Sequence, residues 1–300
     1  MKLVTYHSEG TDRVGMLDAE RELVLEVAIP GPTGKGGLLE CIESWGAPGA
    51  PTQAPADGVP LASVELRAPF RPRRNVFCVG KNYRDHSAEF ARSGFDASGS
   101  PRGTEDPPEL PIFFTKPASS VIGPGAPIDP HPGLTRALDY EAELAVIIGR
   151  GGRGIRTEQV WDHIWGYTIV NDVTARDLQR DHKQWFLGKS LDTFCPMGPW
   201  AVTADEVDAR DLTVRCRVNG ELRQEASTRD LIFDIPTLIS VLSAGITLQP
   251  GDIIATGTPA GVGIGFAPPR FLQSADVVEA EITGLGRLVN PVGTGGQATA

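Results

Sequence analysis

The sequences LDYEAELAVII at residues 138–148 and WGYTIVNDVTARDLQRD at residues 165–181 decide the fold of this 300-residue chain. Glu141 and Glu143 open an apolar run whose composition and length are typical of a β-strand. Side chains two residues apart on a strand lie on the same face, roughly 6–7 Å apart, so one strand presents both carboxylates. Asp172 ends a second apolar run, which predicts a third carboxylate at the end of a neighbouring strand.

A Glu-x-Glu pair in a strand is more often the solvated face of an antiparallel sheet than a functional site. Here Ala145 and Ile147 continue the face that carries the two glutamates, which favours a buried strand with polar residues only at its end. Three carboxylates that meet at strand ends are hard oxygen ligands, which suit Mg²⁺, Mn²⁺ or Ca²⁺. The sequence therefore predicts a divalent-metal site, with a solvated sheet face as the alternative.

The composition excludes several classes of protein. A hydrophobic content of 40% over 300 residues can bury a sizeable core, and a net charge of -10 argues against nonspecific binding to DNA or RNA. No apolar run approaches the length of about 20 residues needed to cross a bilayer, and the N-terminal stretch lacks the apolar region of a signal peptide. The four cysteines are scattered and show no C-x-x-C spacing, which is typical of free thiols in a reducing compartment. We therefore expect a cytoplasmic protein with free thiols.

Turn residues divide the chain into a short N-terminal part and a long main part. With 35 glycines and 25 prolines, the sequence predicts many turns and few long helices. Residues 1–70 read as a small β-rich domain without a recognisable function, residues 71–292 as the main domain, and residues 293–300 as a flexible tail. In the main domain, Asn219–Gly220 predicts a hairpin turn and residues 233–242 predict a helix.

A candidate pair of catalytic residues lies on a predicted helix that begins near Asp85 and ends at Gly94. His86 and Glu89 are three residues apart on this helix and therefore lie on one face, although most pairs at this spacing are simply solvated. Residues 94–110, which follow, are polar and rich in proline and glycine, and they cannot bury enough surface to order themselves. They form either a mobile lid over the site or a surface insertion.

Two glycine-rich segments follow predicted strands. Gly149–Gly154 spells G-x-G-x-x-G, as a dinucleotide-binding site would. Against a nucleotide site, the next helix is expected to begin only at Thr157, and the preceding strand opens with two glutamates. A tight turn between strands explains these glycines, and a nucleotide site is the alternative. In Thr256–Gly263, backbone N–H groups can cradle a carboxylate.

Several motifs together resemble the fumarylacetoacetate hydrolase family, in its branch of acylpyruvate hydrolases and 2-hydroxyhepta-2,4-diene-1,7-dioate isomerases. They extend over about residues 75–290 and read NYxDHxxE, YExELAVIIG, NDVTARDLQ, GKSLDT and GTPAGVG. The resemblance implies an α+β fold, mostly β, with mixed sheets rolled around a metal site, and a homodimer. It also implies that Glu141, Glu143 and Asp172 bind Mg²⁺ or Mn²⁺, for which Ca²⁺ could substitute. Without the cation these carboxylates would repel, so Glu141→Gln is expected to leave the fold intact or slightly more stable.

The resemblance further implies roles for residues around the metal. His86 and Glu89 match the dyad that activates water in metal-dependent acylpyruvate hydrolases of this family. Lys189 is the cation expected beside the oxyanion that develops during the reaction. The residues expected to bind the substrate are Lys116, Arg176, Gln179 and Thr258.

The implied reaction is hydrolysis of a C–C bond in a 2-oxo (diketo) acid such as an acylpyruvate, through a metal-stabilised enolate, as in aromatic catabolism. Isomerisation or decarboxylation of 2-hydroxymuconate-type or oxaloacetate-type acids on the same site is the first alternative, and the dyad favours hydrolysis. An alternative of a different class is a nucleotide-binding protein that uses Gly149–Gly154. The expected partners are a small 2-oxo acid and a second copy of the chain, with no nucleic acid and no membrane.

Overall fold

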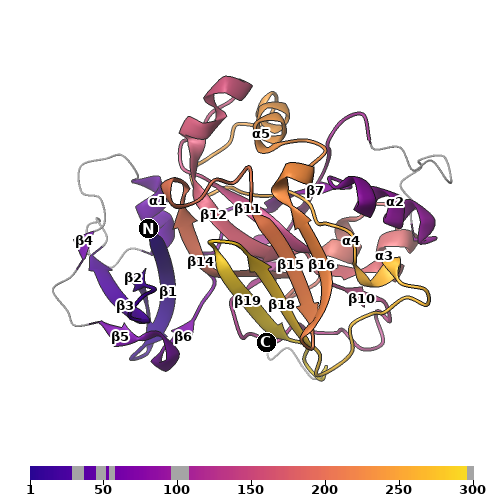
Figure 1. Cartoon of the computed structure of the whole chain (residues 1–300), viewed down its shortest axis with the longest axis horizontal. Helices are drawn as coiled ribbons and strands as arrows, with labels where there is room; N and C mark the ends of the chain where they lie inside the picture. The colour runs from indigo at the N-terminus through magenta and orange to yellow at the C-terminus, as the bar shows by residue number, and fades with distance from the viewer. Residues whose placement is uncertain (29–36, 45–51, 54–57, 96–107, 296–300) are drawn as a thin grey trace.

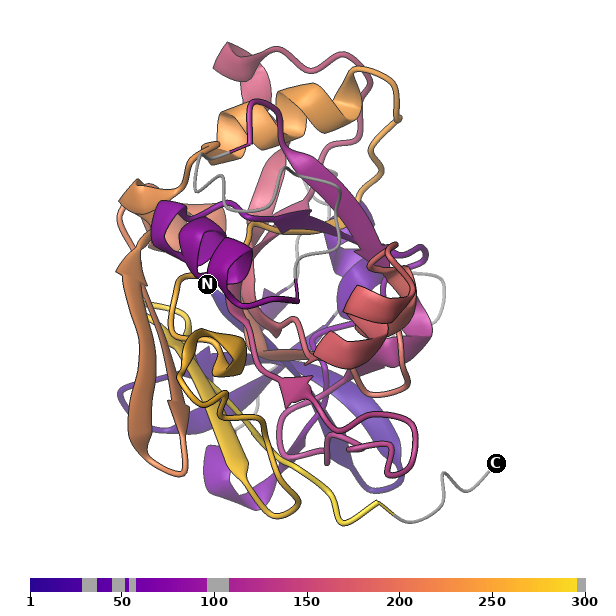
Figure 2. The same ribbon diagram turned by 90° about the vertical axis from the view of Figure 1, so that its right-hand side faces the viewer.

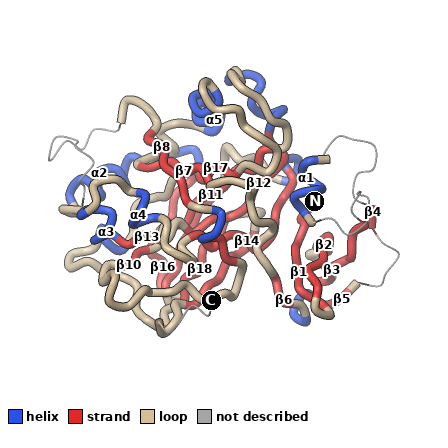
Figure 3. The backbone as a smooth tube through the Cα atoms, turned by 180° about the vertical axis from the view of Figure 1, so that it is seen from behind, coloured by secondary structure: helices blue, strands red, loops and turns tan. Residues whose placement is uncertain are grey.

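The structure is a computed structural model that describes residues 1–28, 37–44, 52–53, 58–95 and 108–295. A long mixed sheet forms the centre of the molecule (Figure 1). In spatial order its strands are β4 (Thr52–Gln53), β3 (Leu23–Ala28), β2 (Thr11–Asp18), β1 (Lys2–Ser8), β14 (Cys195–Thr203), β12 (Ile164–Asn171), β11 (Ala142–Ile148), β17 (Ile253–Ala255), β7 (Val76–Gly80) and β8 (Ile112–Lys116). Three further short strands pair with members of this sheet: β5 (Val59–Pro60) with β3, β6 (Glu65–Leu66) with β1, and β9 (Val121–Ile122) with β14. Figure 3 shows the central strands from behind.

A second sheet packs against this one. It is antiparallel and contains β16 (Glu221–Ser227), β15 (Thr213–Val218), β18 (Val277–Ile282) and β19 (Gly286–Pro291). A short pair joins β10 (Leu138–Asp139) to β13 (Thr174–Ala175). Buried side chains of β15, β18 and β19 share one hydrophobic cluster with those of β11 and β12. This dominance of mixed sheets confirms the predicted α+β fold class.

The predicted hairpin lies in the second sheet. Asn219 and Gly220 connect β15 to β16 with φ angles of 52° and 80°. A two-residue turn of this kind requires positive φ at both positions, which Asn and Gly adopt more readily than other residues. The local sequence signal was therefore sufficient to locate this turn.

The α-helices are short, with between four and nine residues each. They are α1 (Leu38–Glu43), α2 (Arg84–Arg92), α3 (Arg176–Asp181), α4 (Phe186–Lys189) and α5 (Ile235–Ser243). The 3₁₀ helices are η1 (Leu61–Ser63), η2 (Ala118–Ser120), η3 (Thr157–His163), η4 (Ala204–Glu206), η5 (Thr228–Asp230) and η6 (Gly263–Gly265). In Figure 1, α2, α3 and α4 lie at the end of the molecule opposite the N-terminal strands, and Figure 2 faces that end. Among the described helices, none is both long and apolar enough to span a bilayer.

Helix α5 corresponds to the helix predicted at residues 233–242. The Asp234 side chain caps its first turn by accepting a hydrogen bond from the backbone N–H of Thr237 at 2.9 Å. Pro236 occupies this first turn, where its missing N–H has no intrahelical partner to lose. Both features fix where the helix begins.

The N-terminal strands continue the long sheet instead of forming a sheet of their own. Strand β1 pairs with β14 in antiparallel register, with Leu3 opposite Ala201. Strand β1 also pairs with β2 and β6 on the N-terminal side. The domain boundary expected near residue 70 therefore stays a prediction, because a continuous sheet crosses it.

Candidate active site

Three carboxylates meet where β11 begins and β12 ends. Glu143 lies on β11, Glu141 immediately precedes that strand, and Asp172 immediately follows β12. The antiparallel pairing brings these ends together, and the backbone N–H of Asp172 donates to the carbonyl oxygen of Glu141 at 2.8 Å. One carboxylate oxygen from each residue lies within 4.8 Å of the others, and all three residues are buried. The structure thus brings the three predicted metal ligands to one point.

Three buried cations surround this acidic centre. The Lys189 ammonium donates to Glu141 at 2.8 Å and to Asp172 at 2.7 Å, so it bridges two of the carboxylates. Lys116 donates to the other oxygen of Asp172 at 2.5 Å, and the Arg176 guanidinium lies 2.6 Å from Glu141. Buried charges are costly unless they are paired, and these contacts supply the pairing.

The two glutamates of the Glu-x-Glu pair differ in their surroundings. Burial alone would raise the pKa of Glu141, but the charges of Lys189 and Arg176 hold that pKa well below its ordinary value. For Glu143, burial and the other two carboxylates raise the pKa well above its ordinary value. Its contacts include the backbone N–H of Gly257 at 2.8 Å. The expectation that Glu141→Gln would relieve repulsion is therefore corrected, because the Glu141 charge is matched by two cations.

The predicted dyad lies on α2, which ends just before Gly94 with its positive φ of 78°. The His86 Nδ1 atom is 3.3 Å from a carboxylate oxygen of Glu89. Glu89 is held in place by the backbone N–H of Gly261, which lies 3.0 Å and 3.2 Å from its two oxygens. His86 is buried and lines the same cavity as Glu141. The dyad therefore faces the acidic centre with its histidine.

The cavity at the acidic centre is small and has an aromatic wall. Its free volume is about 20 Å³, which is room for about one water molecule. The Trp185 indole packs edge-to-face against Phe90 and Phe114, with ring centroids 6.0 Å and 5.5 Å apart. It lies so close to Gly80 that a Cβ there would be 2.2 Å from the indole. Nothing in the sequence marked Trp185, since its position depends on segments that meet only in the folded chain.

The predicted substrate-binding residues lie at different depths. Gln179 and Thr258 line the cavity together with Arg176. Arg176 donates to the Gln179 side chain at 3.2 Å, and the Thr258 hydroxyl donates to a backbone carbonyl at 3.0 Å. Lys116 lies behind Asp172, is fully buried and is not among the residues that line the cavity. The structure thus places Lys116 against Asp172 and the other three residues at the wall of the cavity.

The glycine-rich turn Thr256–Gly263 binds carboxylates of this chain itself. Three of its glycine N–H groups donate to Glu143, Glu89 and Asp139 at 2.8, 3.0 and 2.6 Å. Asp139 also accepts a hydrogen bond from Arg176 at 2.9 Å. The sequence indicated that such a turn can hold a carboxylate, but it could not show which one. Asp139 was missed as a site residue, although it stands two residues before Glu141.

The segment Gly149–Gly154 has no features of a nucleotide site. Strand β11, which leads into it, is antiparallel to both β12 and β17, whereas a dinucleotide fold requires parallel strands. The 3₁₀ turn η3 follows it in place of an α-helix, so no helix N-terminus faces the glycines. Gly152 instead pairs with Leu248 of a neighbouring loop. These glycines form a turn, as expected from the first interpretation.

The segment at residues 94–110 was expected to be a lid or a surface insertion. Residues 96–107 lie outside the described part of the chain, so neither interpretation is tested.

Comparisons with known proteins find relatives over most of the chain. The family model "Fumarylacetoacetate (FAA) hydrolase C-terminal" matches residues 75–293. Oxaloacetate tautomerase YisK of Bacillus subtilis is 52% identical over 235 residues, which cover 78% of this chain and 74% of that protein. The mitochondrial oxaloacetate tautomerase fahd2 of Xenopus laevis is 44% identical over 234 residues, covering 77% of this chain and 69% of that protein.

Solved structures of similar fold match nearly the whole chain. A fumarylacetoacetate hydrolase from Exiguobacterium antarcticum has a TM-score of 0.81 and 43% identity, covering 98% of this chain and 99% of that one. A 2-hydroxyhepta-2,4-diene-1,7-dioate isomerase from Mycobacterium marinum has a TM-score of 0.77 and 36% identity, covering 99% and 100%. The matched family model, these similarities and the carboxylate centre lead to one conclusion: the chain belongs to the fumarylacetoacetate hydrolase family.

Proposed function

We propose that this enzyme interconverts the keto and enol forms of a small 2-oxo diacid of the oxaloacetate type. The observation that carries the proposal is the buried centre of three carboxylates and three cations, which shares its cavity with a histidine. Two relatives named as oxaloacetate tautomerases support this reaction over hydrolysis of an acylpyruvate. The sequence motifs favoured hydrolysis, with isomerisation as the alternative, and the relatives support the alternative better.

The residues present fit a divalent metal. Glu141, Glu143 and Asp172 offer three hard oxygen donors at one point, a set that suits Mg²⁺ or Mn²⁺. Bound there, such a cation would act as a Lewis acid toward the 2-oxo group of the substrate. Cation binding favours the ionised form of Glu143, whose pKa is raised by burial and by the other two carboxylates.

The other residues of the cavity would bind the substrate and transfer its proton. Arg176 and Lys189 supply positive charge toward a dianionic substrate, and Gln179 supplies an amide for its polar groups. His86 faces the same cavity and would move the proton that shifts between oxygen and carbon during tautomerisation. Trp185 closes one side and limits access of water to the reacting carbon, which suppresses hydrolysis.

The test is a comparison of three reactions with purified enzyme and Mn²⁺: enol-to-ketone conversion of oxaloacetate, release of pyruvate from oxaloacetate, and cleavage of an acylpyruvate. We expect the first to be the fastest. His86→Ala should lower its kcat by roughly 10²–10⁴, the range for loss of a positioned acid–base group. Calorimetric Mn²⁺ affinity should stay unchanged in this variant. Faster acylpyruvate cleavage than tautomerisation would instead establish the hydrolase.

We infer a homodimer from the family resemblance and a cytoplasmic location from the scattered cysteines and the lack of a long apolar run in the sequence. Sedimentation equilibrium of the full chain tests the dimer, and a monomer at micromolar concentration would contradict it.

A further inference from the structure

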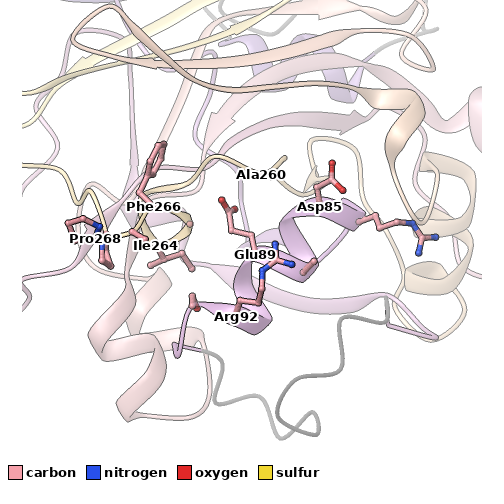
Figure 4. Close-up of a pocket in the computed structure, with 13 residues that line it drawn as sticks. Asp85, Glu89, Arg92, Ala260, Ile264, Phe266 and Pro268 are labelled. Carbon is pink, nitrogen blue, oxygen red and sulfur yellow. The ribbon is translucent and has the colours of Figure 1, made fainter.

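Helix α2 separates two cavities. On one side lies the small cavity of the acidic centre, to which α2 contributes His86 and Phe90. On the other side an open cavity of about 800 Å³ lies between α2 and residues 264–269. Glu89 lines the open cavity, and Figure 4 shows its side chain among Asp85, Arg92, Ile264 and Phe266. The two members of the dyad therefore belong to different cavities.

The dyad joins these two cavities. His86 lines the small catalytic cavity, and Glu89 lines the open cavity. The contact between His86 Nδ1 and the Glu89 carboxylate, at 3.3 Å, spans the helix face between them. The exposed fraction of the side chain rises from 6% for His86 to 13% for Glu89. A proton on the buried histidine thus has a carboxylate beside it that is itself in contact with solvent.

The Glu89 carboxylate is fixed in this position. Gly261 donates its backbone N–H to both oxygens, at 3.0 Å and 3.2 Å. The backbone of Gly265 comes so close that an added Cβ would be 1.6 Å from one carboxylate oxygen. A glycine at 265 therefore leaves room for the carboxylate between His86 and the open cavity. A side chain held only to orient the imidazole would not need a route to solvent.

We propose that protons enter and leave the active site through the open cavity, and that Glu89 transfers them between His86 and water in that cavity. The proposal rests on the proposed tautomerase function. When His86 Nε2 takes a proton from the substrate, the proton on Nδ1 passes to Glu89, and Glu89 releases it to water in the open cavity. The reverse sequence returns a proton, so atoms and charge balance over each cycle. The catalytic cavity has a free volume of only about 20 Å³ before any substrate enters, so the side chains around His86 leave little room for water there.

Chemical rescue tests this route. In Glu89→Ala, kcat for tautomerisation should fall by about 10²-fold, because the relay is broken while His86 remains. Formate is small enough to enter the open cavity and replace the lost carboxylate, so it should restore kcat in a concentration-dependent manner. Glu89→Gln keeps the side-chain volume but cannot carry a proton, and it should lose a similar factor without rescue. His86→Ala is the matched control, which formate should not rescue.

Two further measurements separate a relay from a structural role. In D₂O, the wild type should incorporate deuterium at C3 as fast as it enolises the ketone, whereas Glu89→Gln should return the original proton more often. Ala88→Trp, added to Glu89→Ala, places an indole in the part of the open cavity next to residue 89 and should weaken the formate effect.

Each outcome decides between clear alternatives. Full activity and full deuterium exchange in Glu89→Gln would overturn the relay, as would absence of formate rescue in a folded Glu89→Ala. If Glu89→Ala does not fold, the Glu89→Gln result alone decides. If the wild type itself shows no tautomerisation, the proposed function fails, which is distinguishable because no variant effect is then measured.

Discussion

Two sets of ion pairs in this protein have similar geometry and opposite surroundings. At the acidic centre, Lys189, Lys116 and Arg176 contact carboxylates at 2.5–2.9 Å, and the side chains are 0–5% exposed. On the second sheet, the pairs Arg215–Glu225, Arg217–Glu281 and Arg287–Glu279 have distances of 2.7–3.4 Å, but the side chains are 23–63% exposed. Water can replace a lost partner on the sheet and cannot do so at the centre. Burial, and not distance, therefore sets what each contact contributes.

The same lesson applies within the centre. Glu141 and Glu143 share one strand face, yet Glu141 contacts two cations and Glu143 contacts a backbone N–H and faces two carboxylates. In the metal-free protein the Glu141 charge is therefore balanced by its neighbours, whereas the Glu143 charge is opposed by them. A divalent cation would reverse the balance at Glu143.

The largest expected effect is on metal binding. Glu141→Gln and Glu143→Gln each remove one charged oxygen donor, so both should weaken Mn²⁺ binding by more than the roughly 10–100-fold that follows from losing a residue that only hydrogen-bonds to a metal ligand. Isothermal titration calorimetry with Mn²⁺ measures this, with Arg217→Ala as a control. Unchanged affinity in either glutamine variant would remove that residue from the ligand set.

The stability of the metal-free protein should separate the two glutamates. Glu141→Gln leaves Lys189 and Arg176 buried with a lost partner, and it should destabilise the fold by about 3–5 kcal/mol. Glu143→Gln removes an opposed charge and should change stability little or increase it. Urea unfolding in the presence of a chelator measures both. Equal destabilisation by the two substitutions would mean that the contrast between these glutamates is wrong.

The pH dependence of stability should differ in sign for these residues. A raised folded-state pKa means that Glu143 favours folding while protonated, so its contribution is lost as pH rises above its unfolded pKa of about 4.3. The stability difference between Glu143→Gln and the wild type should therefore grow from pH 4 toward neutral pH in chelator. For Glu141, whose folded-state pKa is lowered, the contribution to stability is fully present above the unfolded-state pKa and is lost as pH falls through the folded-state pKa. A pH-independent difference for Glu143→Gln would contradict the raised pKa.

A smaller effect is expected at Asp139. This buried residue accepts hydrogen bonds from Arg176 and from the N–H groups of Gly263 and Ile264. Asp139→Asn keeps the shape but removes the charge, and it should cost about 1.5–3 kcal/mol, as for hydrogen bonds to a charged group. Thermal or urea unfolding gives the value. A loss below about 0.5 kcal/mol, which is the range of most surface substitutions, would show that the charge of Asp139 contributes no more than an exposed ion pair.

The smallest effect belongs to the exposed sheet. Arg217→Ala removes contacts with Glu279 and Glu281, which are partly solvated, and it should cost about 0.2–1 kcal/mol. A double-mutant cycle with Glu281→Ala isolates the Arg217–Glu281 pair, and its coupling should weaken further at high salt. A coupling as large as that expected at the acidic centre would break the comparison between buried and exposed pairs.

The sequence by itself determined the elements whose signals are local. The apolar runs of β11 and β12 predicted buried strands with carboxylates at their ends, and Asn219–Gly220 predicted a hairpin. His86 and Glu89 were placed on one helix face by their spacing. In each case the residues that make the signal are close in the chain, so backbone geometry alone relates them.

Only the tertiary structure decided which charges meet. Lys189 and Glu141 are 48 residues apart, and Glu89 and Gly261 are 172 residues apart. Such pairs depend on strand register and loop paths, which no local periodicity encodes. The same reason explains why Trp185 and Asp139 were missed, and why the glycine turn was predicted to bind a carboxylate without its partners being known. The sequence supplied the chemical groups of the site, and packing determined their charge balance.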